Sequence, residues 1–292
     1  MKLEVWRDRR GKLSLLRIVT LAVLITPVLI ALYDAESIAH GARPINDLIH
    51  RAGYWALVFL LLTLAVRPLR RIARFAALLD VRRMIGVGTF CYAAAHILLF
   101  VADQMFDLAK VFGEITQRVY LIIGFTALMG LAALAATSTD GMVRRLGGRR
   151  WQRLHQVVYL IALLALVHYF QQTKADVSVP TFVAGLFAWL MGYRLILKLR
   201  KGRGELSPWA LLALTIAVSF LTFLSEAIGI GIAFNVSPLR VLETAFNFDW
   251  DMIRPGWLVL GAGFCVVMLD IVRVWWSGLS PAIRKAQADT AT

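Results

Sequence analysis

The chain has 292 residues, of which 59% are hydrophobic and 17% charged, and its mean hydropathy is +0.70. Soluble proteins are closer to half apolar and a quarter charged, so this composition excludes an ordinary soluble domain. High hydrophobicity also excludes intrinsic disorder, which leaves a membrane protein with several spans. The formal net charge of +14 would indicate nucleic-acid binding only if the basic residues formed one face of a soluble fold.

Apolar runs of about 20 residues predict membrane-spanning helices. Runs of this length are helical rather than the short alternating strands of a membrane barrel, so we expect an all-α integral membrane protein. Eight such runs predict the spans 15–33, 48–66, 84–102, 119–137, 153–171, 181–199, 209–230 and 256–276.

The placement of the basic residues predicts the orientation of these spans. Eight spans put both termini on one side, and the tails and loops of that side hold 25 of the 32 Lys and Arg residues. Because short cytoplasmic loops are enriched in Lys and Arg, we expect both termini to be cytoplasmic. The basic excess then reports topology, and we expect no nucleic-acid partner. The opposite loops hold ten acids against seven bases.

Three histidines, His96, His155 and His168, lie inside expected spans. Imidazoles in a membrane are rare and face a bundle interior, a cavity or a cofactor; hydrogen bonding to a neighbouring helix is the simpler alternative. His96 lies six residues, or about 9 Å of helix rise, from the outer end of the third span, and His168 lies near the outer end of the fifth. Two imidazoles at one depth can ligate a haem iron axially, which leaves no open coordination position and favours electron transfer.

His155 marks a second level, 13 residues or about 20 Å of rise from His168, and about 220° away around a straight helix. A partner on the third span would lie 13 or 14 residues before His96, at Arg83 or Arg82, and arginine does not ligate iron. A second haem would need His155 with a weak or external ligand, or this level holds a flavin or a quinone. The two arginines could pair with a propionate or a phosphate, or simply anchor the cytoplasmic side of the helix.

Other polar residues leave alternatives open. His50, at the outer end of the second span, could supply a ligand or exchange protons, or be a polar helix end, whereas His40 is expected in a loop without a role. Glu226, inside the seventh span, could accept a proton from quinol or hydrogen-bond in its protonated form to a neighbour such as Ser225 or Thr222.

Two further spacings predict structural roles. Asp270 and Arg273, three residues apart, are expected to form a surface ion pair on one helix. Small residues let transmembrane helices approach closely, so close helix packing is expected at Gly229, Gly231, Gly261 and Gly263.

Several short motifs, in this order, resemble the MsrQ (YedZ) family within the ferric-reductase-like transmembrane superfamily. The resemblance covers six spans, from about residue 15 to about residue 205. Its motifs are His50-Arg51-Ala52-Gly53, Arg82-Arg83-Met84-Ile85-Gly86, His96, Thr137-Ser138-Thr139, Leu146-Gly147, Trp151, Leu154-His155, Val158-Tyr159 and His168-Tyr169.

The resemblance implies a membrane subunit that binds one or two b-type haems, with FMN as a further cofactor. His96 and His168 would be the paired iron ligands and His155 the third essential histidine, while His50, Arg82 and Arg83 are weaker cofactor-binding candidates. Electrons would come from the quinone pool or a cytosolic flavin reductase. They would cross the bacterial inner membrane to a periplasmic molybdopterin-containing subunit that reduces methionine sulfoxide and so repairs envelope proteins.

The family pattern also predicts the domain organisation. Residues 1–14 would be a cytoplasmic tail and 15–205 a six-helix haem-binding core. Residues 206–277 would add two spans and a periplasmic loop that the family pattern lacks, and 278–292 would be a second cytoplasmic tail. No flavin or nicotinamide domain follows the core, so the electron donor would be a separate molecule, and this chain a non-catalytic subunit.

Two other functions compete with this interpretation. A self-sufficient membrane ferric reductase or a superoxide-oxidising cytochrome b would turn over alone. A transporter would bind no haem, and broken helices at corresponding positions of two halves, which would favour a transporter, are not evident.

Overall fold

The fold is described from a computed structural model. It describes residues 6, 11–173, 176–201 and 204–289, with side chains as far as Trp275. The expected tails, 1–14 and 278–292, therefore lie mainly outside the described residues or the described side chains.

The described regular structure is helical, which confirms the all-α prediction. Eight of the described helical segments are long and apolar enough to cross a membrane, and each one coincides with an expected span. The second is longer than its apolar run because polar residues extend both of its ends. The eight are Leu15–Tyr33, Pro44–Ile72, Leu78–Asp103, Val119–Ala136, Gly148–Gln172, Ser178–Leu199, Pro208–Phe234 and Pro255–Trp275.

Contacts between residues divide the chain into two units, which are described separately below. The first unit comprises residues 1–66 and 77–174, and the second comprises 67–76 and 175–292. The sixth span, Ser178–Leu199, belongs to the second unit by its contacts. The domain boundaries expected after residues 14, 205 and 277 stay a prediction.

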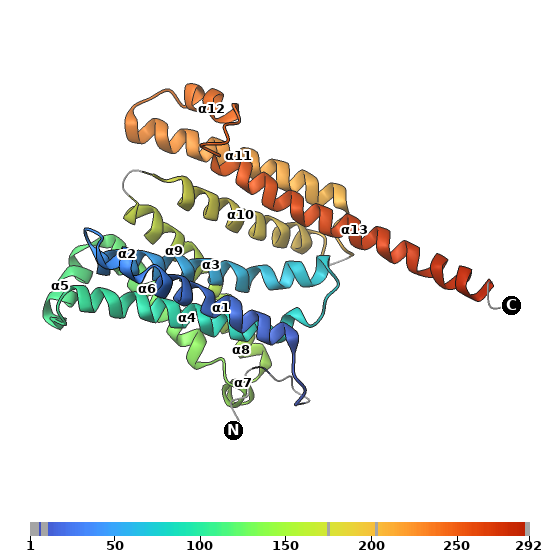
Figure 1. The fold of residues 1–292 in the computed structure, drawn as a ribbon, viewed down its shortest axis with the longest axis horizontal. Coiled ribbons are helices and arrows are strands. Elements are labelled where there is room, and N and C mark those ends of the chain that lie inside the picture. Colours follow the sequence, from blue (N-terminus) through green and yellow to red (C-terminus); the bar gives the residue numbers. More distant parts are fainter. Residues whose placement is uncertain (1–5, 7–10, 174–175, 202–203, 290–292) are drawn as a thin grey trace. The chain divides into compact units, whose positions relative to one another are not determined.

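The first unit contains α1 to α9, except that the end of α3, from residue 67 to residue 72, belongs to the second unit (Figure 1). Helix α1 packs against α4, and α4 and α9 both pack against α6. These helices approach closely where a glycine faces a bulky side chain, as at Gly88 with Leu24 and Gly130 with Ile161. The bounds are α1 Leu15–Tyr33, α2 Ala35–Ala39, α3 Pro44–Ile72, α4 Leu78–Asp103, α5 Leu108–Gln117, α6 Val119–Ala136, α7 Asp140–Leu146, α8 Gly148–Gln156 and α9 Val158–Gln172.

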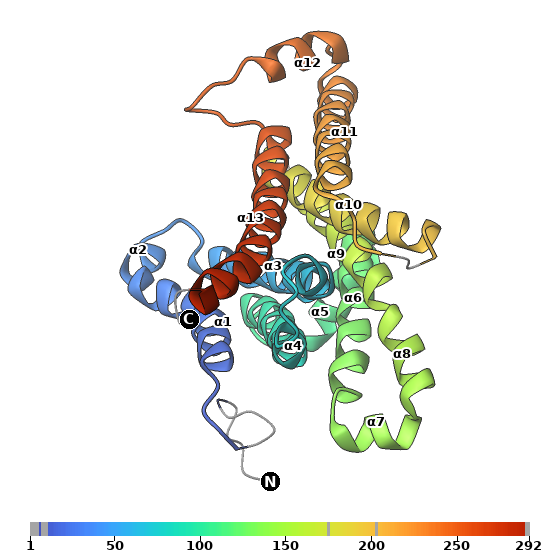
Figure 2. The same cartoon turned by 90° about the vertical axis from the view of Figure 1, so that its right-hand side faces the viewer.

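The fifth span is divided into α8 and α9 at Val157. A short helix, α7, connects α6 with α8 (Figure 2). Its first turn is capped by the Thr139 hydroxyl, which accepts a hydrogen bond from the Met142 amide at 3.2 Å. Gly147 ends α7 with φ of 74°, a conformation that glycine adopts without steric cost. This turn places His155 at the end of α8, beside the start of α9.

The second unit is built around α11, which packs against α10, α12 and α13 and runs beside α13 (Figure 1). Small and hydroxyl-bearing residues allow the close approach: a Cβ at Gly263 would lie 2.4 Å from Thr215, and one at Gly185 would lie 2.5 Å from Val259. The packing expected at Gly263 is confirmed. The bounds are α10 Ser178–Leu199, α11 Pro208–Phe234, α12 Pro238–Phe246 and α13 Pro255–Asp289.

The other glycines of the two G-x-G pairs differ from one another. Gly231 meets Pro238, the first residue of α12, and the Val236 carbonyl, so its close contact is with the start of a helix and the turn that leads to it. A Cβ at Gly229 or Gly261 would meet no atom within 4 Å. The packing prediction was therefore wrong at these two positions, because they lie on the open faces of their helices.

Glu226 is buried and forms an ion pair with Arg254 Nη1 at 3.2 Å. The expected partners were wrong: the Ser225 and Thr222 hydroxyls donate to backbone carbonyls of their own helix instead. A buried charge in a membrane needs a partner. Arg254, in the segment just before α13, is this partner. It lies 28 residues from Glu226 in the sequence, so residue spacing within one helix could not predict the pair.

Asp270 and Arg273 form the expected pair at 2.7 Å, but the surface location was wrong because Asp270 is buried. Arg273 also donates to Glu205 at 3.0 Å, and Glu205 accepts two further hydrogen bonds from Arg74, both at 3.1 Å. Glu205 thus joins the 67–76 segment to α13. The hydrogen bonds from Arg74, ahead of that from Arg273, hold the pKa of Glu205 below its ordinary value.

We expect Glu205→Gln to lower the Tm by a few degrees near neutral pH and to have much less effect in acid. A carboxylate whose pKa is lowered by folding stabilises the folded state above its unfolded pKa, about 4.5, and this contribution is lost as pH falls through the lowered value. Thermal unfolding at about pH 7 and about pH 3.5 measures the difference. Glu243→Gln, at an exposed acid, is the control, and an equal Tm loss for Glu205→Gln at both pH values would contradict the linkage.

Candidate functional site

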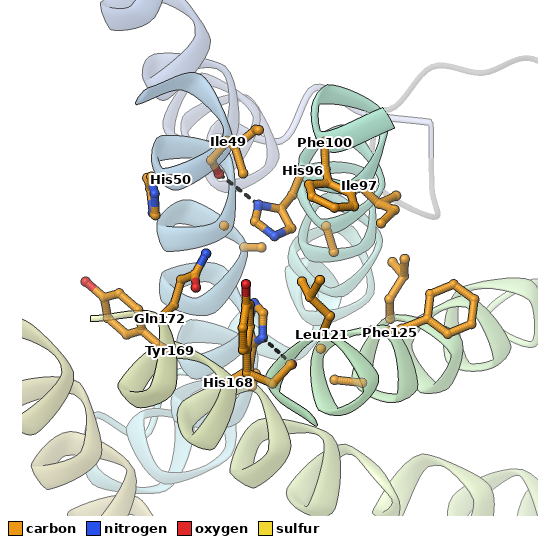
Figure 3. A pocket seen from close by; sticks show the side chains of 18 of the residues that line it. Ile49, His50, His96, Ile97, Phe100, Leu121, Phe125, His168, Tyr169 and Gln172 are labelled. Carbon is orange, nitrogen blue, oxygen red and sulfur yellow. Dashed lines mark hydrogen bonds between the residues drawn. The ribbon is translucent and has the colours of Figure 1, made fainter. Parts of the chain in front are cut away.

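Two imidazoles face each other inside the first unit. His96 comes from α4 and His168 from α9, and their ring centres lie 6.2 Å apart with the ring planes at 83° (Figure 3). The structure therefore brings together the two histidines that the sequence places at one depth. A metal ion bonded to one nitrogen of each ring at about 2 Å would hold the ring centres about 6 Å apart. The observed separation fits one iron between them.

Each ring is oriented by a backbone carbonyl of a neighbouring helix. His96 Nδ1–H donates to the Ile49 carbonyl of α3, and His168 Nδ1–H donates to the Tyr120 carbonyl of α6, both at 2.8 Å. Because a carbonyl only accepts, these bonds place the proton on Nδ1 and leave the Nε2 lone pair for a ligand bond. Hydrogen-bond acceptors of this kind, which do not contact the metal themselves, fix the tautomer and orientation of metal-binding histidines.

A glycine one helical turn after each carbonyl makes room for the ring. A Cβ at Gly53 of α3 would lie 2.9 Å from His96 Nδ1, and one at Gly124 of α6 would lie 2.7 Å from His168 Nδ1. We call each pair of carbonyl and glycine a cradle. The two cradles share one pattern, in which the carbonyl belongs to residue i and the glycine is residue i+4. Gly53 lies in the His50-Arg51-Ala52-Gly53 motif, but Gly124 was missed, and the matching spacing Tyr120-x-x-x-Gly124 is the signal that could have found it.

The two rings project into a cavity of about 860 Å³, here named the paired-histidine cavity (Figure 3). Cofactor pockets of 300–1,000 Å³, lined mainly by apolar side chains, are typical of proteins. Its walls are largely apolar and aromatic, as a porphyrin face requires, and its rim carries cationic groups that suit carboxylates. The walls include Leu57, Leu60, Phe100, Leu121, Phe125 and Leu128, and the rim includes Arg43, Lys110 and Arg118.

His50 also lines this cavity, from the second turn of α3, but it is exposed and is not one of the facing pair. Its neighbour Arg51 forms an ion pair with Asp34 at 2.9 Å, which ties the start of α3 to the end of α1. His40 is exposed and donates from Nδ1 to the Glu36 carbonyl at 2.7 Å. His40 is thus satisfied locally.

His155 lines a second cavity of about 670 Å³ in the same unit, here named the His155 cavity. Its ring stacks on Trp151 at 3.9 Å between ring centres, its Nδ1–H donates to the Trp151 carbonyl at 3.1 Å, and its Nε2 lies 3.3 Å from Ser138 Oγ. Among the described residues that line this cavity, His155 is the one imidazole. The geometry therefore does not fit an iron held by two histidines of this chain.

The same cavity is lined by more basic than acidic side chains. Arg17, Arg82 and Arg83 line it together with Asp80 and Asp140. Arg83 pairs with Asp140 at 2.5 Å, so its charge also fixes the start of α7. Sequence reasoning gave no site role to Arg17, which lies in the first span, and it placed the stacked Trp151 in a motif of the resemblance without a role. This donor set suits an anionic aromatic ligand.

Within the described part of the chain, no group of three or more His, Cys, Asp or Glu side chains could hold a metal ion. Haem does not need such a group, since the porphyrin supplies four nitrogens and the protein adds axial ligands. A facing pair of imidazoles in an apolar cavity is therefore sufficient.

Comparisons with known proteins point the same way. The family model "Ferric reductase like transmembrane component" matches residues 52–166. A Rhodospirillum rubrum protein named "Protein-methionine-sulfoxide reductase heme-binding subunit MsrQ" is 39% identical over 205 residues, which cover 69% of this chain and 95% of that protein. A relative with the same name from Xanthomonas campestris is 44% identical, over 53% of this chain and 72% of that protein. Another from Xanthomonas euvesicatoria is 41% identical, over 59% of this chain and 78% of that protein. No solved structure matches the chain.

Gly124→Ala tests the cradle of His168. The added methyl would overlap the ring, so the ring must turn away from the Tyr120 carbonyl, and we expect haem to bind about tenfold more weakly or worse. Gly261→Ala in α13 is the control, because its methyl would meet no atom within 4 Å and Gly261 lines neither cavity. Haem titration of the apoprotein followed by absorbance measures both, and equal affinity in the two variants would refute the cradle.

Proposed function

This chain belongs to the MsrQ family, and we propose that it is the haem-binding electron-transfer subunit of a methionine-sulfoxide reductase system. The observation that carries the proposal is the facing pair His96 and His168, 6.2 Å apart, with both Nδ1–H groups bonded to carbonyls. Relatives named as haem-binding subunits support the cofactor.

When bound, haem b supplies a one-electron couple, and the protein's part is to ligate, orient and insulate it. His96 and His168 offer Nε2 from two helices, the Ile49 and Tyr120 carbonyls hold the rings, and Gly53 and Gly124 leave them room. If both imidazoles bind the iron, the group would exchange electrons rather than bind oxygen or substrate. Apolar walls exclude water, and Arg43, Lys110 and Arg118 suit the propionates at the rim.

The His155 cavity is proposed as the side on which electrons enter. Its three arginines, Arg17, Arg82 and Arg83, favour a ligand with a phosphate or carboxylate, and the His155–Trp151 stack offers an aromatic face. FMN matches this chemistry better than a second doubly ligated haem does. A haem held by His155 and an external ligand, or a quinol, are the other occupants to be tested.

The donor, the acceptor and the orientation are parts of the same proposal. The count of 25 of 32 basic residues on one side supports cytoplasmic termini in a bacterial inner membrane. In that orientation the paired-histidine cavity lies toward the periplasm, where a molybdopterin-containing subunit would accept electrons and reduce methionine sulfoxide in envelope proteins. Quinol or a cytosolic flavin reductase would supply electrons at the opposite side.

A second candidate function rests on the match of residues 52–166 to a ferric reductase like transmembrane component. A self-sufficient ferric reductase or superoxide-oxidising cytochrome b would exchange electrons with its substrate at the rim of the paired-histidine cavity, without a partner protein. The two functions therefore differ in whether the isolated protein gives electrons to a ferric chelate, or takes them from superoxide, without a partner protein.

We expect His96→Ala and His168→Ala each to lose more than about nine-tenths of the bound haem, since one imidazole cannot provide six-coordinate ligation. His155→Ala should keep it, because its cavity is separate, and His40→Ala is the control for an exposed histidine. The α band of the dithionite-reduced, purified protein measures haem content. A normal α band in both His96→Ala and His168→Ala would disprove the ligand assignment.

Reoxidation of the reduced protein separates the two functions. We expect a ferric chelate to reoxidise the reduced protein slowly, and superoxide to reduce the oxidised protein slowly. A purified periplasmic molybdopterin-containing methionine-sulfoxide reductase should reoxidise the reduced protein at least about tenfold faster than the ferric chelate does. Stopped-flow absorbance at the α band follows each reaction. Fast multiple turnover with the ferric chelate alone would favour the second candidate instead.

A further inference from the structure

An exposed apolar surface lies beside the rim of the paired-histidine cavity. The segment between α4 and α6, which includes α5, carries large apolar side chains that are 67–85% exposed. We name them the apolar patch: Met105, Phe106, Leu108, Phe112 and Val119.

The turn that begins this segment has an unusual backbone. Met105 and Phe106 have φ of 56° and 60°, in the left-handed region that bulky residues rarely adopt. Two consecutive residues of this kind are costly, and such conformations persist when the surroundings compensate for them. Backbone hydrogen bonds supply part of the compensation, because the Met105 amide donates to the Ala102 carbonyl at 2.9 Å and the Phe106 amide donates to the Val101 carbonyl at 3.0 Å. The two side chains add no packing within this chain, since both are exposed.

Helix α5 separates its apolar and charged side chains. Leu108 and Phe112, one turn apart, share an exposed face, whereas Lys110 and Glu114 occupy another face and line the cavity. Thr116, one turn beyond Phe112, donates its hydroxyl to the Phe112 carbonyl at 2.9 Å. The exposed face therefore presents hydrocarbon and no unsatisfied hydroxyl.

The patch continues onto surface that faces hydrocarbon. Val119 begins α6, a membrane-spanning helix, and Ile122 and Met129 farther along α6 are also exposed apolar side chains. Helix α5 packs against α6 and connects the end of one span to the start of another, so it lies where spans leave the membrane (Figure 1). Amphipathic helices in this position lie in the plane of the interface with the apolar face in lipid.

We infer that the apolar patch is a membrane-interface anchor, which inserts Met105, Phe106, Leu108, Phe112 and Val119 into the lipid beside the cavity. The partner is a lipid surface rather than a protein, because the patch continues into the exposed apolar side chains of α6, a membrane-spanning helix. The anchor holds Lys110, Glu114 and Arg118 at the cavity rim, level with the membrane surface. The inference does not depend on which cofactor the cavity binds.

Nitroxide labels on the full-length protein in phosphatidylcholine–phosphatidylglycerol nanodiscs test the anchor. The labels are attached at Leu108→Cys or Phe112→Cys in a Cys91→Ala, Cys265→Ala background. Oxygen concentrates in lipid and a nickel chelate in water, so their relaxation effects report the surroundings of each label. We expect the oxygen-to-nickel ratio at Leu108 and Phe112 to exceed that at the control site, Gln117→Cys, several-fold.

A label at Val119→Cys provides a second reading should either α5 variant fail to fold, as judged by helical circular dichroism. Ratios at Leu108, Phe112 and Val119 equal to those at Gln117 would place the patch in water and overturn the inference. If the labels are in water and addition of a soluble protein shields them from the nickel chelate, the patch is a protein-docking surface. That result would also overturn the inference.

Discussion

Two backbone hydrogen bonds determine the geometry of the candidate haem site. His96 and His168 would rotate freely in an apolar cavity, because hydrocarbon walls offer no directional contact. The Ile49 and Tyr120 carbonyls remove that freedom and leave Nε2 of each ring directed into the cavity. Carbonyls within helices are normally reached only at close approach, and the glycines at i+4, Gly53 and Gly124, make that approach possible. The rest of the unit is arranged to keep α3 beside α4 and α6 beside α9.

The two cavities of the first unit have different chemistry. The paired-histidine cavity has two imidazoles and apolar walls, and the His155 cavity has one imidazole, a stacked tryptophan and three arginines. This difference suits a path in which an anionic donor or cofactor binds in the His155 cavity. The electron then passes to an iron held by two histidines in the paired-histidine cavity. About a third of the chain has no counterpart in the Rhodospirillum rubrum relative. In the second unit, buried pairs such as Glu226–Arg254 hold the helices together.

Much of the fold follows from the sequence because lipid imposes a simple rule: apolar runs of about 20 residues become helices. That rule explains why all eight expected spans are found. Depth along the helices likewise brought His96 and His168 together. What could not be predicted depends on contacts between distant residues: the pairing of Glu226 with Arg254, the burial of Asp270, the close approach at Gly124, and the open faces at Gly229 and Gly261. The left-handed turn at Met105 and Phe106 also carries no glycine or asparagine that would signal it.

The electron paramagnetic resonance spectrum of the oxidised, purified protein tests the central claim most directly. Two axial imidazoles produce a low-spin ferric haem, and ring planes at 83° predict the strongly anisotropic low-spin signal that nearly perpendicular ligands produce. A purely high-spin ferric signal would mean that His96 and His168 do not both bind the iron. A spectrum without any haem signal, from protein purified with its cofactors, would contradict the electron-transfer function itself.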